Sequence, residues 1–324
     1  MINVSIAGGT GYTAGELLRI LLCHPEVNIE SVISTTSAGK RIDSVHRDLL
    51  GDTDLIYSDT FKNPDVIFLC LGHGLSREFL ENNELPVGCK IIDLGNDFRN
   101  QPMFGNKEFV FGLCEQNREE IKKADYVANP GCFATTIMLA LLPLASKNLI
   151  TDEIHIHAIT GSTGAGKRPG ETTHFSYRDN NISVYKPFTH QHLEEIGNTL
   201  TAAGNDKLTQ INFVPMRGDF TRGIFASIYT KWNEKLSEEE TISFYNEYYA
   251  DSPFVFVSEK SISLKEVVNT NKCLLHIEFH NGYIHITSIT DNLVKGASGQ
   301  AVQNMNLMFG FDESLGLKLK GSSF

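Results

Sequence analysis

The sequence of 324 residues contains no apolar run of the ~20 residues that a membrane-spanning helix needs. Residues 1–6 lead directly into an alternating apolar pattern and show no signal-peptide composition. Basic residues are also in deficit, because 28 Lys and Arg face 39 Asp and Glu and leave a net charge of -11. A nucleic-acid or anionic-membrane surface needs basic patches, so we expect neither partner and predict a cytoplasmic location.

Cysteines are few and unpaired in sequence. The six cysteines include no Cys-x-x-Cys pair, which argues against a disulfide framework or a zinc knuckle and is typical of reduced thiols. His190-Gln191-His192 could form half of a metal site, but no cysteine or carboxylate cluster completes it. We therefore predict no metal, and a surface turn is the simpler alternative for this segment.

A glycine-rich turn lies close to the start of the chain. Alternating apolar residues at 2–6 predict a strand, Gly8-Gly9-Thr10-Gly11-Tyr12-Thr13 a turn, and apolar residues at i, i+3, i+4, i+7 and i+8 over 14–22 an amphipathic helix. Such glycines let the backbone approach a pyrophosphate, which the helix N-terminus then holds. A plain tight turn is the alternative, but the flanking strand and helix favour dinucleotide binding. The predicted contacts are Gly8, Thr10, Gly11, Tyr12 and Thr13.

The end of the second predicted strand, at residues 28–34, bears on cofactor choice. An NAD-preferring site commonly places an acidic residue there, whereas this chain continues with Ser34, Ser37, Lys40 and Arg41. Hydroxyl groups and cations suit a 2′-phosphate, so we predict NADPH, with Ser34 and Ser37 among its ligands. A solvated loop is the alternative.

The order of predicted elements indicates two domains. Further strands at 65–71 and 90–94 alternate with helices and predict a Rossmann-type parallel sheet. After about residue 150 the chain becomes strand-rich, at 153–160, 210–214, 223–230, 272–279 and 283–289, which predicts an α+β domain with a mainly antiparallel sheet. Ser237 and Glu240 form a capping-box signature for a helix beside it. We assign residues 1–148 with 294–324 to an NADP-binding domain, its last helix opening at Gly296, and 149–293 to a catalytic and oligomerisation domain.

Cys132 is the candidate nucleophile. It follows Asn129-Pro130-Gly131 and precedes an apolar run, so the thiol is predicted at a helix N-terminus. A helix N-terminus carries roughly +0.5 charge and favours the thiolate, which is the reactive form. A buried, inert cysteine is the alternative when this residue is considered alone.

Several motifs along the whole chain resemble one enzyme family. They are Gly8 to Leu17, Asp93-Leu94-Gly95-Asn96-Asp97-Phe98-Arg99, Asn129 to Cys132, Gly161-Ser162-Thr163-Gly164-Ala165-Gly166, His190-Gln191-His192, and Asp291 to Gln300. In this order they resemble the N-acetyl-gamma-glutamyl-phosphate reductases, arginine-pathway enzymes of the semialdehyde dehydrogenase superfamily. The resemblance implies Cys132 as nucleophile, His192 as catalytic histidine, NADPH as hydride source, and a homo-dimer or homo-tetramer.

The remaining site residues are assigned to the substrate and the nicotinamide. An acyl phosphate needs a nucleophile, an acid or base near neutral pH and an anion site, and His192 suits the second role because imidazole titrates near ~6.5. Arg99 is the first candidate for a phosphate or carboxylate, with an ion pair to Asp93 or Asp97 as the alternative; His190 and Lys167 are further substrate ligands, and Arg168, Arg217 and Arg222 are weaker candidates. Ser162, Gly164 and Asn292 are predicted at the cofactor.

Some residues differ from the family pattern, and these differences bear on which acyl group the substrate carries. Gln191 and Met216 replace family residues, so an N-succinyl-glutamyl phosphate is an alternative substrate, as are acyl-aminoadipyl and aspartyl phosphates. Alternatives of another class are a cysteine hydrolase and an NADP-binding sensor without turnover. Neither explains the glycine turn, Cys132 and His192 together as well as a reductase does.

Overall fold

The computed structural model describes residues 1–72, 74–204, 210–232 and 235–321, which form two compact units. Unit 1 contains Met1–Pro130 and Ala297–Lys318. Unit 2 contains Gly131–Gly296 and the described residues after Lys318. The nine predicted strands all occur, with limits within three residues of those predicted. None of the helices in the described part of the chain has the length and apolar character needed to cross a bilayer.

Unit 1 is built on a parallel sheet of seven strands. Its strands run in the order β3-β2-β1-β4-β5-β9-β8, and the pairs are parallel throughout. The order reverses between β1 and β4, which is the point where ligands bind in such sheets. The strands are β1 (Ile2–Ala7), β2 (Val27–Ile33), β3 (Tyr57–Ser58), β4 (Val66–Leu69), β5 (Lys90–Asp93), β8 (Val110–Phe111) and β9 (Tyr126–Ala128), beside a hairpin of β6 (Met103–Phe104) and β7 (Lys107–Glu108).

The C-terminal helix completes unit 1. All ten residues of α8 (Gly299–Met308) are buried, against α1 (Tyr12–Leu21), α3 (Cys114–Ile121) and β5. Its polar side chains bond to unit 1, since the Gln300 and Asn304 amides both donate to the Gly112 carbonyl at 2.9 Å. The predicted opening of this helix at Gly296 is wrong, because Val294–Ser298 form a π-helix in which the Gly296 N–H bonds the Asp291 carbonyl. The other helix of this unit is α2 (Leu75–Asn82).

Unit 2 contains a mixed, mainly antiparallel sheet. Strand order is β11-β12-β10-β13-β16-β15-β14, and only the β10–β12 and β14–β15 pairs are parallel. The strands are β10 (Ile154–Thr160), β11 (Ser183–Val184), β12 (Ile211–Arg217), β13 (Ile224–Lys231), β14 (Val255–Val257), β15 (Cys273–His280) and β16 (Tyr283–Thr290). Along β10 the side chains alternate, so Ile154, Ile156 and Ala158 are buried while His155 and His157 point to the other face.

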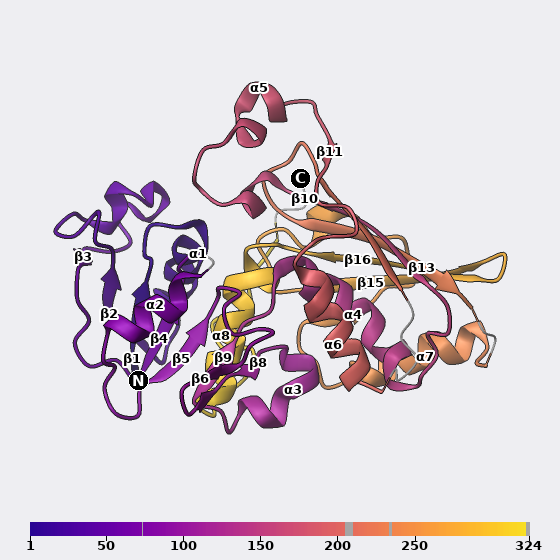
Figure 1. The fold of residues 1–324 in the computed structure, drawn as a ribbon, viewed down its shortest axis with the longest axis horizontal. Helices are drawn as coiled ribbons and strands as arrows, with labels where there is room; N and C mark the ends of the chain where they lie inside the picture. The colour runs from indigo at the N-terminus through magenta and orange to yellow at the C-terminus, as the bar shows by residue number, and fades with distance from the viewer. Residues whose placement is uncertain (73, 205–209, 233–234, 322–324) are drawn as a thin grey trace. The chain divides into compact units, whose positions relative to one another are not determined.

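Helices cover one face of this sheet (Figure 1). They are α4 (Cys132–Ser146), which contacts β13, β15 and β16, α6 (His192–Ala202) on β12, and α7 (Glu238–Tyr248) on β14. The predicted capping box is confirmed, because the Ser237 hydroxyl accepts the Glu240 N–H and Glu240 accepts the Ser237 N–H. Residues 166–189, with α5 (Phe175–Arg178), extend from the end of β10 and are called the arm below.

Helix α4 is apolar on all sides and continues through Pro143. Proline has no N–H, so the carbonyl of Leu139 lacks its usual donor four residues later. The Tyr249 hydroxyl donates to that carbonyl at 2.5 Å, and the Tyr245 hydroxyl donates to Ala140 at 2.7 Å. Two tyrosines from the end of α7 therefore supply the bonds that the proline disturbs, and they anchor the helix that begins with Cys132.

Candidate active site

Cys132 is the first residue of α4, as predicted. The N-cap is Gly131, which has no side chain to cap the helix, so the end of α4 can stabilise an anion. A Cβ atom on Gly296 would lie 2.8 Å from the Cys132 Cβ, so glycine lets the π-helix backbone pack against the thiol residue. Two other cysteines are poor nucleophiles, because burial raises the pKa of both Cys70 and Cys89 to about 12.

His192 lies beside this helix start. It is the first residue of α6 and is 5% exposed. A Cβ atom on Gly131 would lie 2.3 Å from the His192 Nε2, so the imidazole packs directly on the peptide that precedes Cys132. The structure thus brings together the two residues predicted to be catalytic, although they are 60 positions apart in sequence.

Glu195 is a site residue that the sequence analysis missed. Its side chain is buried in the first turn of α6, and Oε2 accepts the Gly131 N–H at 3.0 Å. Its Oε1 atom lies 3.9 Å from the His192 Nε2. One carboxylate therefore links the turn before Cys132 to the imidazole. The sequence signal for Glu195 was its position three residues after His192, which places both residues on the same face of a helix.

His190 supports His192 rather than acting as a cation. Its Nδ1 accepts the His192 N–H at 3.2 Å, and the two rings are 4.6 Å apart. Burial, with a smaller contribution from the Lys186 charge, lowers the pKa of His190 to about 4. At neutral pH this imidazole is uncharged, so any contact with substrate would be a neutral hydrogen bond.

The predicted nicotinamide residues in unit 2 form one connected cluster. Ser162 and Gly164 lie in a 3₁₀ turn, Ser162–Ala165, at the end of β10. The Asn292 amide donates to the Thr163 hydroxyl at 3.0 Å and accepts the Gly223 N–H at 2.7 Å. Asn292 therefore ties the Gly161–Gly166 loop to the start of β13, and its side-chain bonds are already committed to protein groups.

The glycine turn in unit 1 fits a dinucleotide. Gly8 has a φ of +82°, and a Cβ atom there would lie 2.5 Å from the Cys70 carbonyl oxygen, so only glycine suits the turn. Gly11 is the N-cap of α1 and provides no capping side chain, which leaves the helix end for a phosphate. Thr10 lies in the turn, and Tyr12 and Thr13 form the first turn of α1, where the Thr13 carbonyl accepts the Ser298 hydroxyl.

The segment after β2 also forms a turn, in which the Ser37 N–H bonds the Ser34 carbonyl. The Ser34 hydroxyl is 3.3 Å from the Thr36 hydroxyl, so hydroxyl groups do cluster at this strand end. Arg41 pairs with Asp43 at 2.7 Å and Asp54 at 2.6 Å. The guanidinium is therefore neutralised by protein carboxylates, and the hydroxyls are the better ligands for a 2′-phosphate.

The candidate anion ligands differ in the protein groups that already contact them. Arg99 donates to the backbone carbonyls of Asn129 and Leu94, at 2.9 and 3.0 Å. Asp97 instead caps α2, accepting the N–H groups of Gly74, Ser76 and Arg77. Arg222 makes a two-bond ion pair with Asp291 and so is already compensated.

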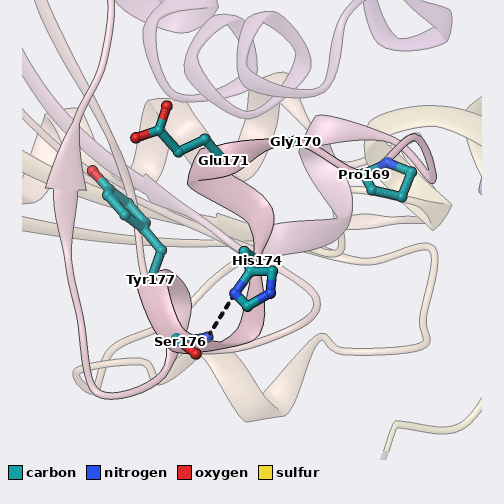
Figure 2. A pocket seen from close by; sticks show the side chains of 6 residues that line it. All are labelled: Pro169, Gly170, Glu171, His174, Ser176 and Tyr177. Carbon is teal, nitrogen blue, oxygen red and sulfur yellow. Dashed lines mark hydrogen bonds between the residues drawn. The ribbon is translucent and has the colours of Figure 1, made fainter.

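A pocket lies on the arm, apart from the residues described above. Figure 2 shows its lining side chains, which come from one continuous segment, and the bond from the Ser176 N–H to the His174 Nδ1. The exposed Lys167 precedes this pocket by two residues. None of the predicted site residues lines it; its residues are Pro169, Gly170, Glu171, His174, Ser176 and Tyr177. Among the described residues, no group of three or more His, Cys, Asp or Glu is arranged to hold a metal.

Comparison with known proteins first defines the class. Residues 3–124 match the family described as "Semialdehyde dehydrogenase, NAD binding domain", and residues 132–292 match "Semialdehyde dehydrogenase, dimerisation domain". The fold is similar to aspartate semialdehyde dehydrogenase II of Vibrio cholerae, with a TM-score of 0.72, 17% identity, and coverage of 96% of this chain and 98% of that chain. It is equally similar to the Candida albicans aspartate semialdehyde dehydrogenase, with a TM-score of 0.73, 16% identity, and coverage of 95% and 99%.

Sequence identity then shows which family within this class the chain belongs to. Over the whole of both chains, this protein is 54% identical to the N-acetyl-gamma-glutamyl-phosphate reductase of Flavobacterium johnsoniae. It is 52% identical to the reductase of the same name from Christiangramia forsetii, again over the whole of both chains. The chain belongs to the N-acetyl-gamma-glutamyl-phosphate reductase family.

Proposed function

We propose that this protein reduces an N-acyl-gamma-glutamyl phosphate, the N-acetyl compound by family, to the N-acylglutamate semialdehyde and phosphate, using NADPH. The observation that carries the proposal is the position of Cys132 at the uncapped start of α4, with His192 packed on the preceding peptide. A sensor without turnover would not need a thiol in this environment.

The reaction begins when the Cys132 thiolate attacks the acyl carbon, and the carbon–oxygen bond to phosphate breaks to leave a thioester. Bound NADPH supplies the hydride that reduces the thioester carbonyl. The resulting oxyanion collapses, the carbon–sulfur bond breaks, and the aldehyde leaves with the thiolate restored. His192 takes the thiol proton before attack and donates to the developing oxyanion, while Glu195 and His190 lie against its ring.

For the cofactor, we propose that the Gly8–Thr13 turn holds the pyrophosphate and that Ser34 and Ser37 face the 2′-phosphate. Support comes from the positive φ of Gly8, the uncapped start of α1 and the hydroxyl cluster after β2. We also propose Ser162, Gly164 and Asn292 of unit 2 as cofactor ligands. On this view unit 1 is the NADP-binding domain and unit 2 the catalytic domain.

We also propose a cytoplasmic homo-dimer or homo-tetramer. All six cysteines are free thiols, which fits a reducing compartment. The sheet face of unit 2 opposite α4 carries aromatic rings, with His155 stacked on Tyr229 at 4.9 Å, within a segment that matches a dimerisation family. A mass corresponding to one chain in light scattering would contradict the oligomer.

The test of covalent catalysis is Cys132→Ser. We expect phosphate-dependent reduction of NADP by the semialdehyde, the reverse reaction, to be lost while NADP affinity is retained. Cys23→Ser removes an exposed cysteine outside the site and is the matched control. Mass spectrometry of the wild-type protein should trap an acyl group on Cys132, and full activity of Cys132→Ser would disprove the thioester route.

A further inference from the structure

Arg217 and Arg178 of unit 2 have no carboxylate partner within the described part of the chain. Arg217 ends β12, and Arg178 ends α5 of the arm with only 6% of its surface exposed. Among the described residues, neither guanidinium forms an ion pair, and the Nε atom of each is buried without a hydrogen-bond partner. The nearest acidic residues in sequence, Asp179 and Asp219, instead accept hydrogen bonds from Asn180.

These charges cannot be removed by deprotonation, because a guanidinium stays protonated in proteins. Arg178 is buried and Arg217 is half-buried, and a charge withdrawn from water without a charged partner is costly, so such a site is expected to bind an anion. The protein as a whole is acidic, with a net charge of -11, which makes two uncompensated arginines in one place more informative. Arg222, by contrast, is already neutralised by Asp291.

Contacts fix the two arginines relative to each other. Arg178 Nη1 donates to the Arg217 carbonyl at 3.1 Å, and Nη2 donates to the Ser183 hydroxyl at 3.0 Å. Ser183 is the register partner of Arg217 in the β11–β12 pair. Arg178 therefore holds the arm on the end of β12 and is a positioning residue, whereas the Arg217 guanidinium lies beside the Tyr185 ring with its Nε atom unbonded.

The Arg217 guanidinium is connected to His190 through the ring of Tyr185. It lies 4.6 Å from the centroid of Tyr185, whose ring is 5.7 Å from that of His190. Burial raises the pKa of Tyr185, and the Arg217 charge beside its ring opposes that rise. Two aromatic rings separate Arg217 from His192, and this spacing suits the remote end of the substrate rather than the phosphate on the reacting carbon.

We propose that Arg217 binds a carboxylate at the remote end of the acyl phosphate substrate, with Arg178 holding it in position. The proposal rests on the proposed function, and two carboxylates could supply the ligand. One is the α-carboxylate of the glutamyl group, and the other is a carboxylate in the N-acyl group, as in a succinyl substrate. Both would bind in the plane of the guanidinium, through two N–H donors.

The test compares Arg217→Gln and Arg217→Lys with Lys260→Gln, which removes an exposed positive charge of unit 2 outside the proposed site. Reverse-reaction kinetics use N-acetylglutamate semialdehyde, its α-carboxamide and N-succinylglutamate semialdehyde. If the α-carboxylate is the ligand, Arg217→Gln should raise KM for the acetyl substrate about 10- to 100-fold, with a smaller change in kcat, and should not affect the carboxamide. If the acyl carboxylate is the ligand, only the KM for the succinyl substrate should rise. Arg217→Lys should recover part of either loss, and Lys260→Gln should change neither.

Calorimetry with N-acetylglutamate, its α-carboxamide and N-succinylglutamate separates this inference from the proposed function, because it needs no turnover. Weaker binding by Arg217→Gln of the compounds that carry the recognised carboxylate would support the site even if the reductase activity were absent. Equal effects of Arg217→Gln on the charged and amide compounds, or a rise only in the KM for phosphate, would overturn the proposal. A folded Arg217→Gln protein with wild-type constants for every compound would do the same.

Discussion

Replacing Gly131 with alanine tests the contact between the His192 ring and the peptide that precedes Cys132. The φ and ψ angles of Gly131 are -73° and 152°, which alanine adopts without strain, so the backbone need not change. The added methyl group would lie 2.3, 2.6 and 2.7 Å from three atoms of the His192 ring. Optimal contact between such atoms is about 3.5 Å, so the imidazole has to withdraw by about 1 Å.

We expect this displacement to reduce kcat by about 100-fold, the usual effect of misplacing a catalytic group by 1 Å. The overpacked site should also lose about 1–3 kcal/mol of stability. Initial rates of the reverse reaction measure the first effect, and urea denaturation measures the second. NADP binding by fluorescence titration should not change, because the substitution leaves the cofactor turn intact.

Gly170→Ala is the matched control, since a Cβ atom there would meet only the Thr173 hydroxyl, at 3.7 Å. This variant should keep wild-type kcat and stability. The reasoning is refuted if Gly131→Ala retains wild-type kcat, because the imidazole would then not be needed at its observed position. A loss of activity equal in both glycine variants would also refute it.

Two further predictions concern stability. Tyr249→Phe leaves the Leu139 carbonyl without the donor that compensates for Pro143, so the free energy of unfolding should fall by about 1–3 kcal/mol in urea denaturation; an unchanged midpoint would contradict this account. Burial raises the pKa of Asp93 from 3.8 to about 6, so the folded state holds the proton more tightly and stability falls as pH rises from 3.8 through 6. Unfolding free energies at pH 4 and 7 should show the wild type losing up to about 3 kcal/mol relative to Asp93→Asn, and parallel pH profiles of the two proteins would reject a shifted carboxyl.

Local patterns were sufficient for the elements and for the position of Cys132 at the start of a helix. The glycine turn before α1 and the apolar run after Cys132 are signals within a few residues, and both predicted helices begin where expected. The alternation of β10 predicted which side chains would be buried. The first residue of the last helix was not predicted, because a π-helix precedes it. That π-helix is closed by the bond from the Gly296 N–H to the Asp291 carbonyl, five residues earlier, and such a bond leaves no periodic pattern in the sequence.

The partners of charged residues could not be predicted, because they are set by distant segments. Arg222 and Asp291 are 69 positions apart, and their pairing removes one candidate anion ligand, while Arg217, five positions earlier, has no carboxylate partner among the residues that the structure describes. Glu195 was missed for the same reason, since its bond reaches back 64 positions to Gly131. Counting arginines in a sequence gives candidates, but only their neighbours show which of them can bind a ligand.

The path of the chain has a consequence for biosynthesis. Unit 1 begins at Met1 but needs α8, whose ten buried residues follow almost all of unit 2. On the ribosome the N-terminal segment therefore emerges first yet cannot close its core until translation is nearly finished, whereas 131–296 is continuous and can fold earlier. Nascent chains truncated before α8 should leave apolar surface of α1 and α3 exposed to chaperones.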